Sequence, residues 1–164
     1  AGPVTGARAI YGATGIAARG AGARRGAVIA RVAGVSGARV AARSRVAARS
    51  GVAAGAFGAH ALKEILDAPM LQVFETATRY VMYHAFGLCI VSLAIDRYPD
   101  QGLEKSGWFF IAGMFLFSVS LYVVSLAGIR WMGAVTPIGG LAFMIGWLLL
   151  GWGVWRAAQQ AGKF

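Results

Sequence analysis

The chain has 164 residues, of which 58% are hydrophobic and 13% are charged, and it carries a formal net charge of +10. Its mean hydropathy of +0.63 lies far from that of an ordinary soluble domain, so the composition indicates a membrane protein with enough chain for one domain. The single cysteine, Cys89, lies inside an apolar run, which excludes an intramolecular disulfide and a cysteine-based metal cluster.

The positive charge is concentrated in an N-terminal arm, residues 1–50, which holds nine arginines and no acidic residue. The body, residues 51–164, holds seven basic and six acidic residues, so its net charge is +1. An arginine-rich, acid-free segment with few bulky apolar side chains is typical of a mitochondrial or plastid transit peptide. We therefore expect the arm to direct the chain to an organelle.

Two other interpretations of the arm are a disordered basic tail and a nucleic-acid-binding segment. The arm cannot bury a core of its own, which is compatible with a tail. Its only aromatic residue is Tyr11, so it lacks the interleaved aromatic side chains on which bases stack. We expect no nucleic-acid partner, whereas contact with anionic lipid suits the charge.

A first helix is predicted over roughly 38–62, although Arg39, Arg43, Arg45 and Arg49 lie in its first half. Each arginine would cost about 2.5–3.5 kcal/mol at the centre of an isolated membrane span. We expect this helix to enter the membrane only shallowly, to direct its arginine side chains to the membrane interface, or to pair them with groups of a partner.

Small residues recur at helical spacing in the first and last predicted helices, where they allow close approach of another backbone. The predicted helix-packing residues are Gly51, Gly55, Gly58 and Ala59 in the first helix and Gly139, Gly140, Ala142 and Gly146 in the last. Thr136 and Pro137 are expected to make a kinked, closely packed entry to the last helix.

A polar lock is predicted between the first helix and the FETATRY segment, formed by His60, Glu64, Glu75, Arg79 and His84. Residues four apart are neighbours on a helix, so Glu75 and Arg79 are expected to form an ion pair. Alternatively, two histidines from facing helices could ligate haem or a metal. No supporting ligand cluster accompanies them, so the favoured interpretation is that each histidine lies near a helix end and hydrogen-bonds Glu75, Tyr83 or a backbone carbonyl.

Three long uncharged runs follow, at 80–95, 107–129 and 131–155. A membrane-spanning helix needs roughly 20 apolar residues, so the last two runs qualify outright and the first does so when extended into its flanks. Arg130 alone separates the last two runs, which predicts a tight helical hairpin. We expect helices at roughly 74–96, 107–128 and 133–156, the first of them entered near Asp67 or Ala68 because Pro69 suits a first helical turn.

The predicted fold is an all-α membrane protein: a bundle of four transmembrane helices, the first atypical and interrupted by arginine, preceded by the basic arm. Four spans place the arm, the connection with Arg97 and Lys105, and the C-terminal tail on one side. By the positive-inside rule, both termini are expected to face the mitochondrial matrix, or the cytoplasm if the protein is bacterial. Hydroxyls in the spans could line a polar path, but such groups more often bond backbone carbonyls or facing helices; they are Ser118, Ser120, Ser125 and Thr136.

The body resembles a known family of small membrane proteins, the domain of unknown function 423 family, which includes the eukaryotic transmembrane protein 256. The stretches that carry this resemblance occur in order and are GAFGAHALK (55–63), FETATRYVMYHAFGL (74–88), LFSVSLYVVSLAG (116–128) and TPIGGLAFMIGW (136–147). The resemblance implies four membrane helices and, in eukaryotes, a mitochondrial location. The family has no established catalytic residues, so the resemblance assigns none to this chain. The family's first span is normally apolar, whereas this chain has arginines there.

No phosphate loop, positioned nucleophile or dinucleotide fingerprint is visible in the sequence, so we expect no enzyme and no cofactor. The expected function is that of a non-catalytic accessory subunit of a mitochondrial inner-membrane complex. Among such complexes, those of the respiratory chain are the favoured expectation. Its expected partners are other protein subunits and membrane lipids including cardiolipin. The alternatives are a small transporter or channel component, and a haem- or metal-binding membrane protein that uses His60 and His84.

Overall fold

A computed structural model of the chain describes residues 34, 36–58, 60–99 and 101–161. The part of the predicted arm before residue 34, and the packing residue Ala59, lie outside the described residues. The predicted arm and the predicted first helix overlap, and the structure has residues 36–50 in a helix that continues to residue 58.

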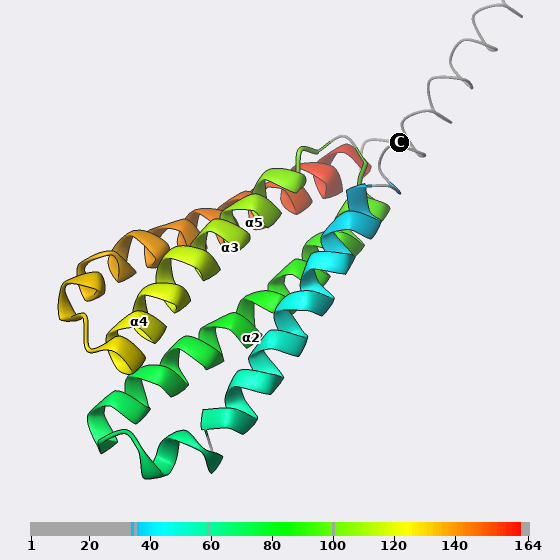
Figure 1. The fold of residues 1–164 in the computed structure, drawn as a ribbon. Helices are drawn as coiled ribbons and strands as arrows, with labels where there is room; N and C mark the ends of the chain where they lie inside the picture. Colours follow the sequence, from blue (N-terminus) through cyan, green and yellow to red (C-terminus); the bar gives the residue numbers. More distant parts are fainter. Residues whose placement is uncertain (1–33, 35, 59, 100, 162–164) are drawn as a thin grey trace, which may run out of the picture.

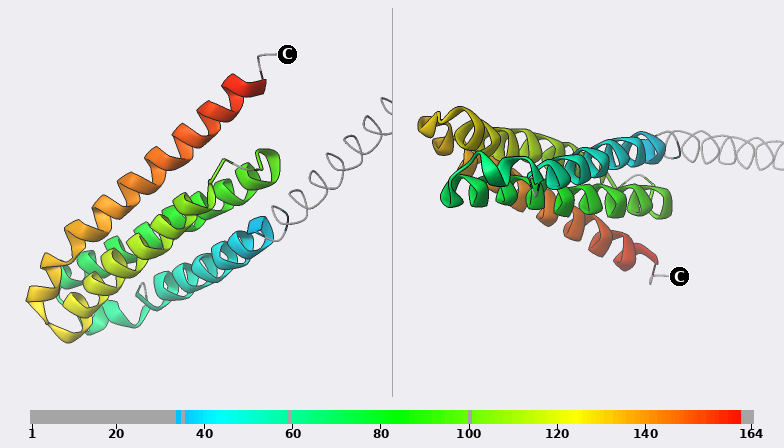
Figure 2. Two further views of the ribbon diagram at one scale, coloured as in Figure 1. Left: turned by 90° about the horizontal axis from the view of Figure 1, so that it is seen from above. Right: turned by 60° about the horizontal axis from the view of Figure 1, so that its bottom comes forward.

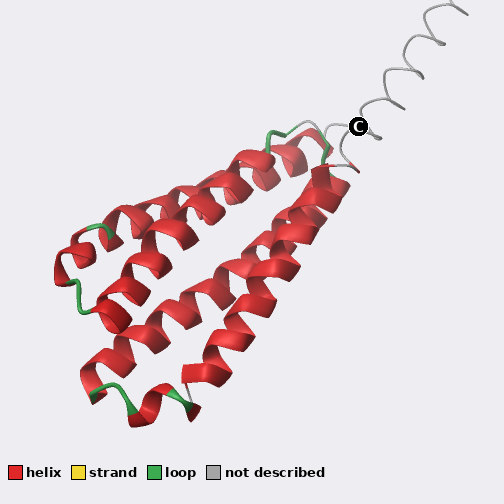
Figure 3. Cartoon of the chain, in the orientation of Figure 1, coloured by secondary structure: helices red, strands yellow, loops and turns green. Residues whose placement is uncertain are grey.

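The described residues are almost entirely helical and contain no strand (Figure 3). After the first helix, 36–58, a short 3₁₀ turn at Leu62–Glu64 leads into α2, Ala68–Arg97. The next long helix consists of α3 (Glu104–Gly113), a π-helical segment (Met114–Val119) and α4 (Ser120–Ala127). A 3₁₀ turn, Arg130–Ala134, then precedes α5, Thr136–Ala161.

The four long helices run up and down in one bundle (Figure 1). The first helix and α5 lie on opposite sides of the central pair formed by α2 and α3–α4 (Figure 2). Ser92 of α2 donates to the Gly37 carbonyl oxygen at 2.9 Å, and the Gln101 amide donates to Gln160 at 2.9 Å. These bonds gather the start of the first helix, the α2–α3 connection and the end of α5 at one end of the bundle.

The start of α2 is the predicted one. Asp67 is the N-cap residue, and its carboxylate accepts a hydrogen bond from the Met70 backbone N–H at 2.9 Å. Pro69 occupies the first turn, where the missing N–H costs no helical hydrogen bond. The Asp67–Pro69 signal thus located the start of α2 correctly, whereas the rough range of 74–96 left out residues 68–73.

The predicted hairpin between the last two spans is also confirmed. α4 is followed by its C-cap residue Gly128, whose φ of 69° is the left-handed conformation that glycine adopts without steric cost. Pro137 lies in the first turn of α5, as Pro69 does in α2. A proline in that position removes no interior hydrogen bond, so it marks the entry of the helix.

Phenylalanine rings seated on glycines hold α3 to α5. A Cβ at Gly146 would lie 2.6 Å from the Phe110 ring, and a Cβ at Gly113 would lie 2.6 Å from Cε1 of Phe143. The Ser106 hydroxyl donates to the Gly146 carbonyl oxygen at 2.7 Å in the same contact. Each helix thus inserts one ring into a glycine notch of the other, which glycine alone can provide.

Small residues of the first helix lie against α2. A Cβ at Gly51 would meet the Met82 sulfur at 2.6 Å, and one at Gly58 would meet the Phe74 ring at 2.7 Å. Gly55 lies at ordinary contact distance from Thr78. Three of the predicted packing glycines therefore share the face that touches α2.

The predicted packing residues of α5 separate into two faces. Gly139 lies on the Phe117 backbone and Ala142 is buried, as is Gly146. At Gly140, by contrast, a Cβ would have no heavy atom within 4 Å beyond its chain neighbours and its own helix backbone, because one step along a helix turns the side-chain direction by about 100°. Gly140 does not belong to the packing face.

Among the described residues, three helices are long and apolar enough to cross a membrane: Ala68–Arg97, Glu104–Ala127 and Arg130–Ala161. The first helix is not one of them, and it contains the four arginines that the sequence identified as costly. The fold is the predicted all-α membrane bundle of four helices.

Substitution of Gly146 by alanine is expected to lower the free energy of unfolding by about 1–3 kcal/mol, because the added methyl group overlaps the Phe110 ring. Gly151→Ala on the same helix is the matched control, since no heavy atom beyond its chain neighbours and its own helix backbone lies within 4 Å of its Cβ position. The control should leave stability unchanged or raise it by up to about 1 kcal/mol. Equilibrium unfolding in mixed micelles measures the free energy of unfolding of both variants. Equal effects of the two substitutions would contradict the packing of the Phe110 ring against Gly146.

Candidate functional site

His84 lies in the middle of α2, not near a helix end as the sequence led us to expect. Its side chain is 5% exposed. Its ring stacks on Phe143 of α5, with centroids 3.4 Å apart and an interplanar angle of 7°. Nδ1 lies 2.9 Å from the Tyr80 carbonyl oxygen, so the Nδ1–H donates to the backbone of its own helix.

Four aromatic residues surround the stacked pair. Phe110 lies tilted by 57° against His84, with ring centroids 5.4 Å apart, and Tyr80 stacks on Phe117 at 4.3 Å. Trp147 lies 4.9 Å from Phe110. His84 is therefore the one imidazole in an otherwise apolar junction of α2, α3 and α5, where aromatic pairs add packing energy beyond buried area.

An outward-opening hollow of about 710 Å³ borders this junction. Its lining includes Tyr83, His84, Pro137, Gly140 and Trp147. Gly140, which is absent from the helix-packing face, thus lines this hollow. Aromatic rings and one imidazole make the hollow suited to an apolar chain or ring and poor in groups that could perform acid–base chemistry.

The predicted polar lock does not form as one group. Arg79 and Glu75 make the expected ion pair, with Nη2 and Oε2 2.8 Å apart, but both side chains are about half exposed. Such a surface pair contributes little to stability, typically about 0–1 kcal/mol. His84 lies one helical turn or more away along α2 and faces α5, so it contacts neither member of the pair.

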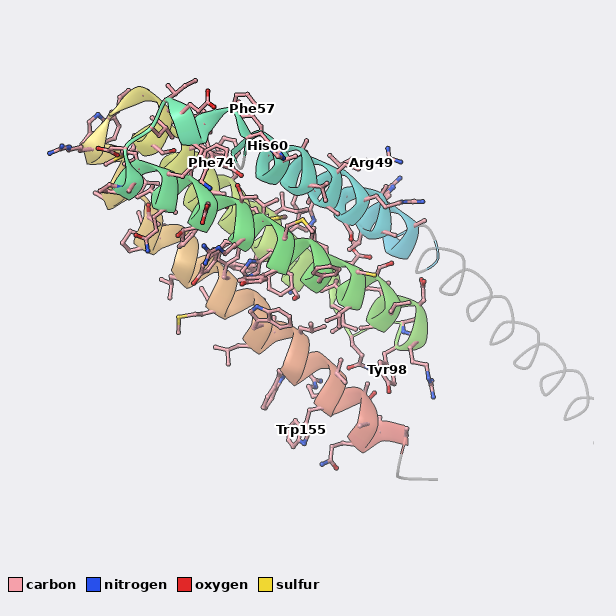
Figure 4. All side chains as sticks on the ribbon, turned by 90° about the horizontal axis from the view of Figure 1, so that it is seen from below. Arg49, Phe57, His60, Phe74, Tyr98 and Trp155 are labelled. Carbon is pink, nitrogen blue, oxygen red and sulfur yellow. The ribbon has the colours of Figure 1, made fainter. Side chains whose placement is uncertain are left out.

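His60 lies at the end of the first helix, near Phe57 and Phe74 (Figure 4). Its side chain is exposed, and within the described residues the only ion pair is Glu75–Arg79, so His60 and Glu64 do not form one. The first helix packs on α2 through its glycine face, whereas His84 faces α5. The two histidines are therefore not brought together as a ligand pair.

Hydroxyl groups in the spans bond to the bundle itself, as predicted. Ser118 donates to the Ala77 carbonyl oxygen at 3.1 Å, which joins the π-helical segment to α2. Ser120 and Thr136 lie 2.9 Å apart and join α4 to α5. Ser125 donates to the Tyr122 carbonyl oxygen at 3.2 Å within its own helix. These bonds satisfy groups that lipid could not.

No group of three or more histidine, cysteine or carboxylate side chains is placed to hold a metal ion in the part of the chain that the structure describes. Every fully buried side-chain nitrogen or oxygen there has a hydrogen-bond partner. The best-defined site is thus the aromatic junction around His84, whose geometry is that of a packing element.

Sequence reasoning missed the π-helical segment and the role of the phenylalanines. No residue pattern in the sequence predicts the π-helical segment Met114–Val119, because π-helices are rare and occur mostly as single turns inside α-helices. Phe110 and Phe143 could have been found from their glycine partners, since a large ring opposite a notch is the usual complement of a small-residue face.

His84→Ala is expected to lower the free energy of unfolding by about 3 kcal/mol, because it removes an aromatic ring from a packed junction. His84→Phe keeps the stack and loses only the Nδ1 hydrogen bond, so about 1 kcal/mol is expected. His60→Ala, at an exposed position, should stay within about 0.5 kcal/mol. A visible absorption band lost in both His60→Ala and His84→Ala would instead indicate a shared chromophore.

Comparison with known proteins identifies the family of this chain. Residues 54–140 match the family model described as "Protein of unknown function (DUF423)". The chain is 44% identical over 97 residues to the UPF0382 membrane protein YwdK of Bacillus subtilis, covering 58% of this chain and 79% of that protein. It is 46% identical over 96 residues to UPF0382 membrane protein SSP2132 of Staphylococcus saprophyticus, covering 58% and 79%. No solved structure is significantly similar. The chain belongs to the DUF423 family of membrane proteins.

Proposed function

We propose that this chain is a non-catalytic structural subunit of a mitochondrial inner-membrane complex, and of the respiratory chain in particular. The observation that carries this proposal is the contrast between the inside and the outside of the bundle. Inside, the hydroxyls and the buried imidazole bond to the chain's own backbone. On the outside, large apolar side chains are exposed along the helices.

The outer face of α5 illustrates this contrast. Leu141, Met144, Leu148, Trp152 and Trp155 lie three or four residues apart, which places them on one helix face, and each is more than half exposed. Gly140 and Gly151 are open to the outside as well. An apolar stripe with small residues is what a neighbouring membrane helix packs against.

The mitochondrial location rests on the composition of the arm, which is rich in arginine and free of acid. The proposed orientation rests on charge. One end of the bundle carries Arg39, Arg97, Lys105 and Arg156, so the positive-inside rule assigns that end to the matrix. Cardiolipin and other subunits are the proposed partners of the membrane domain.

A photo-crosslinking amino acid at Leu148, which is 71% exposed, is expected to capture a neighbouring subunit in mitochondria, and the chain should migrate with a large native complex. The matched control is the same group at Leu150, which is 5% exposed and faces the bundle, and it should give no intermolecular product.

Migration as a monomer in mild detergent, with equal crosslinking from both positions, would contradict the proposed subunit role. Substrate flux into liposomes that contain only the purified chain would favour a transporter in its place.

A further inference from the structure

A second hollow, of about 570 Å³, lies between the first helix, α2 and the α3–α4 helix. Its walls are almost entirely apolar and include Val46, Leu88, Met114 and Phe115. Two hydroxyls of its lining are already bonded: Ser118 to the Ala77 carbonyl oxygen and Tyr122 to Thr78. An occupant therefore meets hydrocarbon along most of this groove.

One charged side chain, Arg43, lines the groove. Its guanidinium carbon lies 4.1 Å from the centroid of the Trp108 ring, a cation–π contact that fixes the planar group by its face. Stacking by the face leaves the N–H groups at the edge of the guanidinium free to donate. Arg43 has no ion-pair partner among the described residues.

Arg43 also lines a small polar hollow of about 90 Å³, together with Ser36, Arg39, Glu104 and Trp108. The two hollows therefore adjoin at Arg43. Arg39 and Arg43 against Glu104 give the small hollow a net charge of +1. It lies beside the first turn of α3, at the end of the bundle that holds the α2–α3 connection.

The apolar groove runs from this charged end toward the interior of the bundle. From Ile111 to Tyr122 the lining helix rises by roughly 16 Å, at about 1.5 Å per residue. A molecule that fills both hollows needs an anionic group at one end and a hydrocarbon chain of that length at the other. Basic pockets between membrane helices recognise anionic lipid head groups in this way.

We propose that these adjoining hollows form a binding site for an anionic membrane phospholipid, with its phosphodiester on Arg39 and Arg43 and one acyl chain in the groove. The arginine forks donate to the phosphate oxygens, and Trp108 holds Arg43 in position. Glu104 opposes a second negative charge, so a singly charged diester fits better than a highly charged head group. Such a site needs only the four-helix bundle, including the arginines of the first helix, whether or not the chain joins a complex.

The test uses the full chain in nanodiscs of phosphatidylcholine with phosphatidylglycerol, and native mass spectrometry to measure how much phosphatidylglycerol each variant retains. Arg43→Gln is expected to retain about tenfold less than the parent, because it loses a charge-assisted hydrogen bond. Arg49→Gln is the matched control. It removes the same charge from the same helix, but Arg49 lies outside the groove lining and points away from the bundle (Figure 4).

Two further variants keep the result interpretable if Arg43→Gln is unstable. Ala47→Phe places a ring in the groove without changing charge and should also lower retention. Glu104→Gln removes the one acidic neighbour and should leave retention equal or raise it. A phosphatidylglycerol with a photoreactive group in its acyl chain should label peptides that contain Met114–Tyr122.

Equal loss in Arg43→Gln and Arg49→Gln would overturn the proposal, since it would show only general attraction of anionic lipid to the first helix. So would a preference for phosphatidylethanolamine that Glu104→Gln abolishes, because the small hollow would then bind an ammonium group. Labelling confined to other segments would overturn the acyl-chain groove. None of these results bears on membership of a respiratory complex, which the Leu148 crosslink measures separately.

Discussion

The close approach of α3 and α5 is the constraint on which the rest of the bundle depends. Phe110 enters a notch at Gly146, and Phe143 enters one at Gly113, so neither helix can move along the other without withdrawing a ring. The same Phe143 ring is the platform on which His84 of α2 stacks. In lipid, where apolar burial gives helices no strong reason to associate, such van der Waals fit and interhelical hydrogen bonds provide the attraction.

The placement of the buried polar groups depends on the same close approach of the helices. A hydroxyl or imidazole facing hydrocarbon would be costly, and each fully buried one in the described spans is bonded to a nearby carbonyl or hydroxyl. Ser106, Ser118 and Ser92 each donate to a carbonyl oxygen of a different helix, which their short side chains can reach only because the backbones are close. Small residues and serines thus act together as one packing device.

The first helix differs from the other helices because its two halves have opposite properties. Its C-terminal half presents glycines to α2, while its N-terminal half carries arginines that an isolated span would not tolerate. Placing Arg43 against the Trp108 ring, beside a polar hollow, gives one of these charges a favourable environment. The helix therefore closes one side of the bundle and leaves an apolar groove between itself, α2 and the α3–α4 helix.

The sequence by itself determined the fold class, the hairpin at Arg130, the Asp67–Pro69 start of α2, the Glu75–Arg79 pair and the family, because hydropathy, capping residues and neighbours four apart are local properties. Only the tertiary structure decided that His84 stacks on Phe143 and does not meet His60, that Gly140 faces outward, and that Arg43 lines a groove. These outcomes depend on which face of each helix meets which neighbour. In an apolar span of nearly uniform hydropathy, that rotation is set by the fit of rings into glycine notches, which no single helix contains.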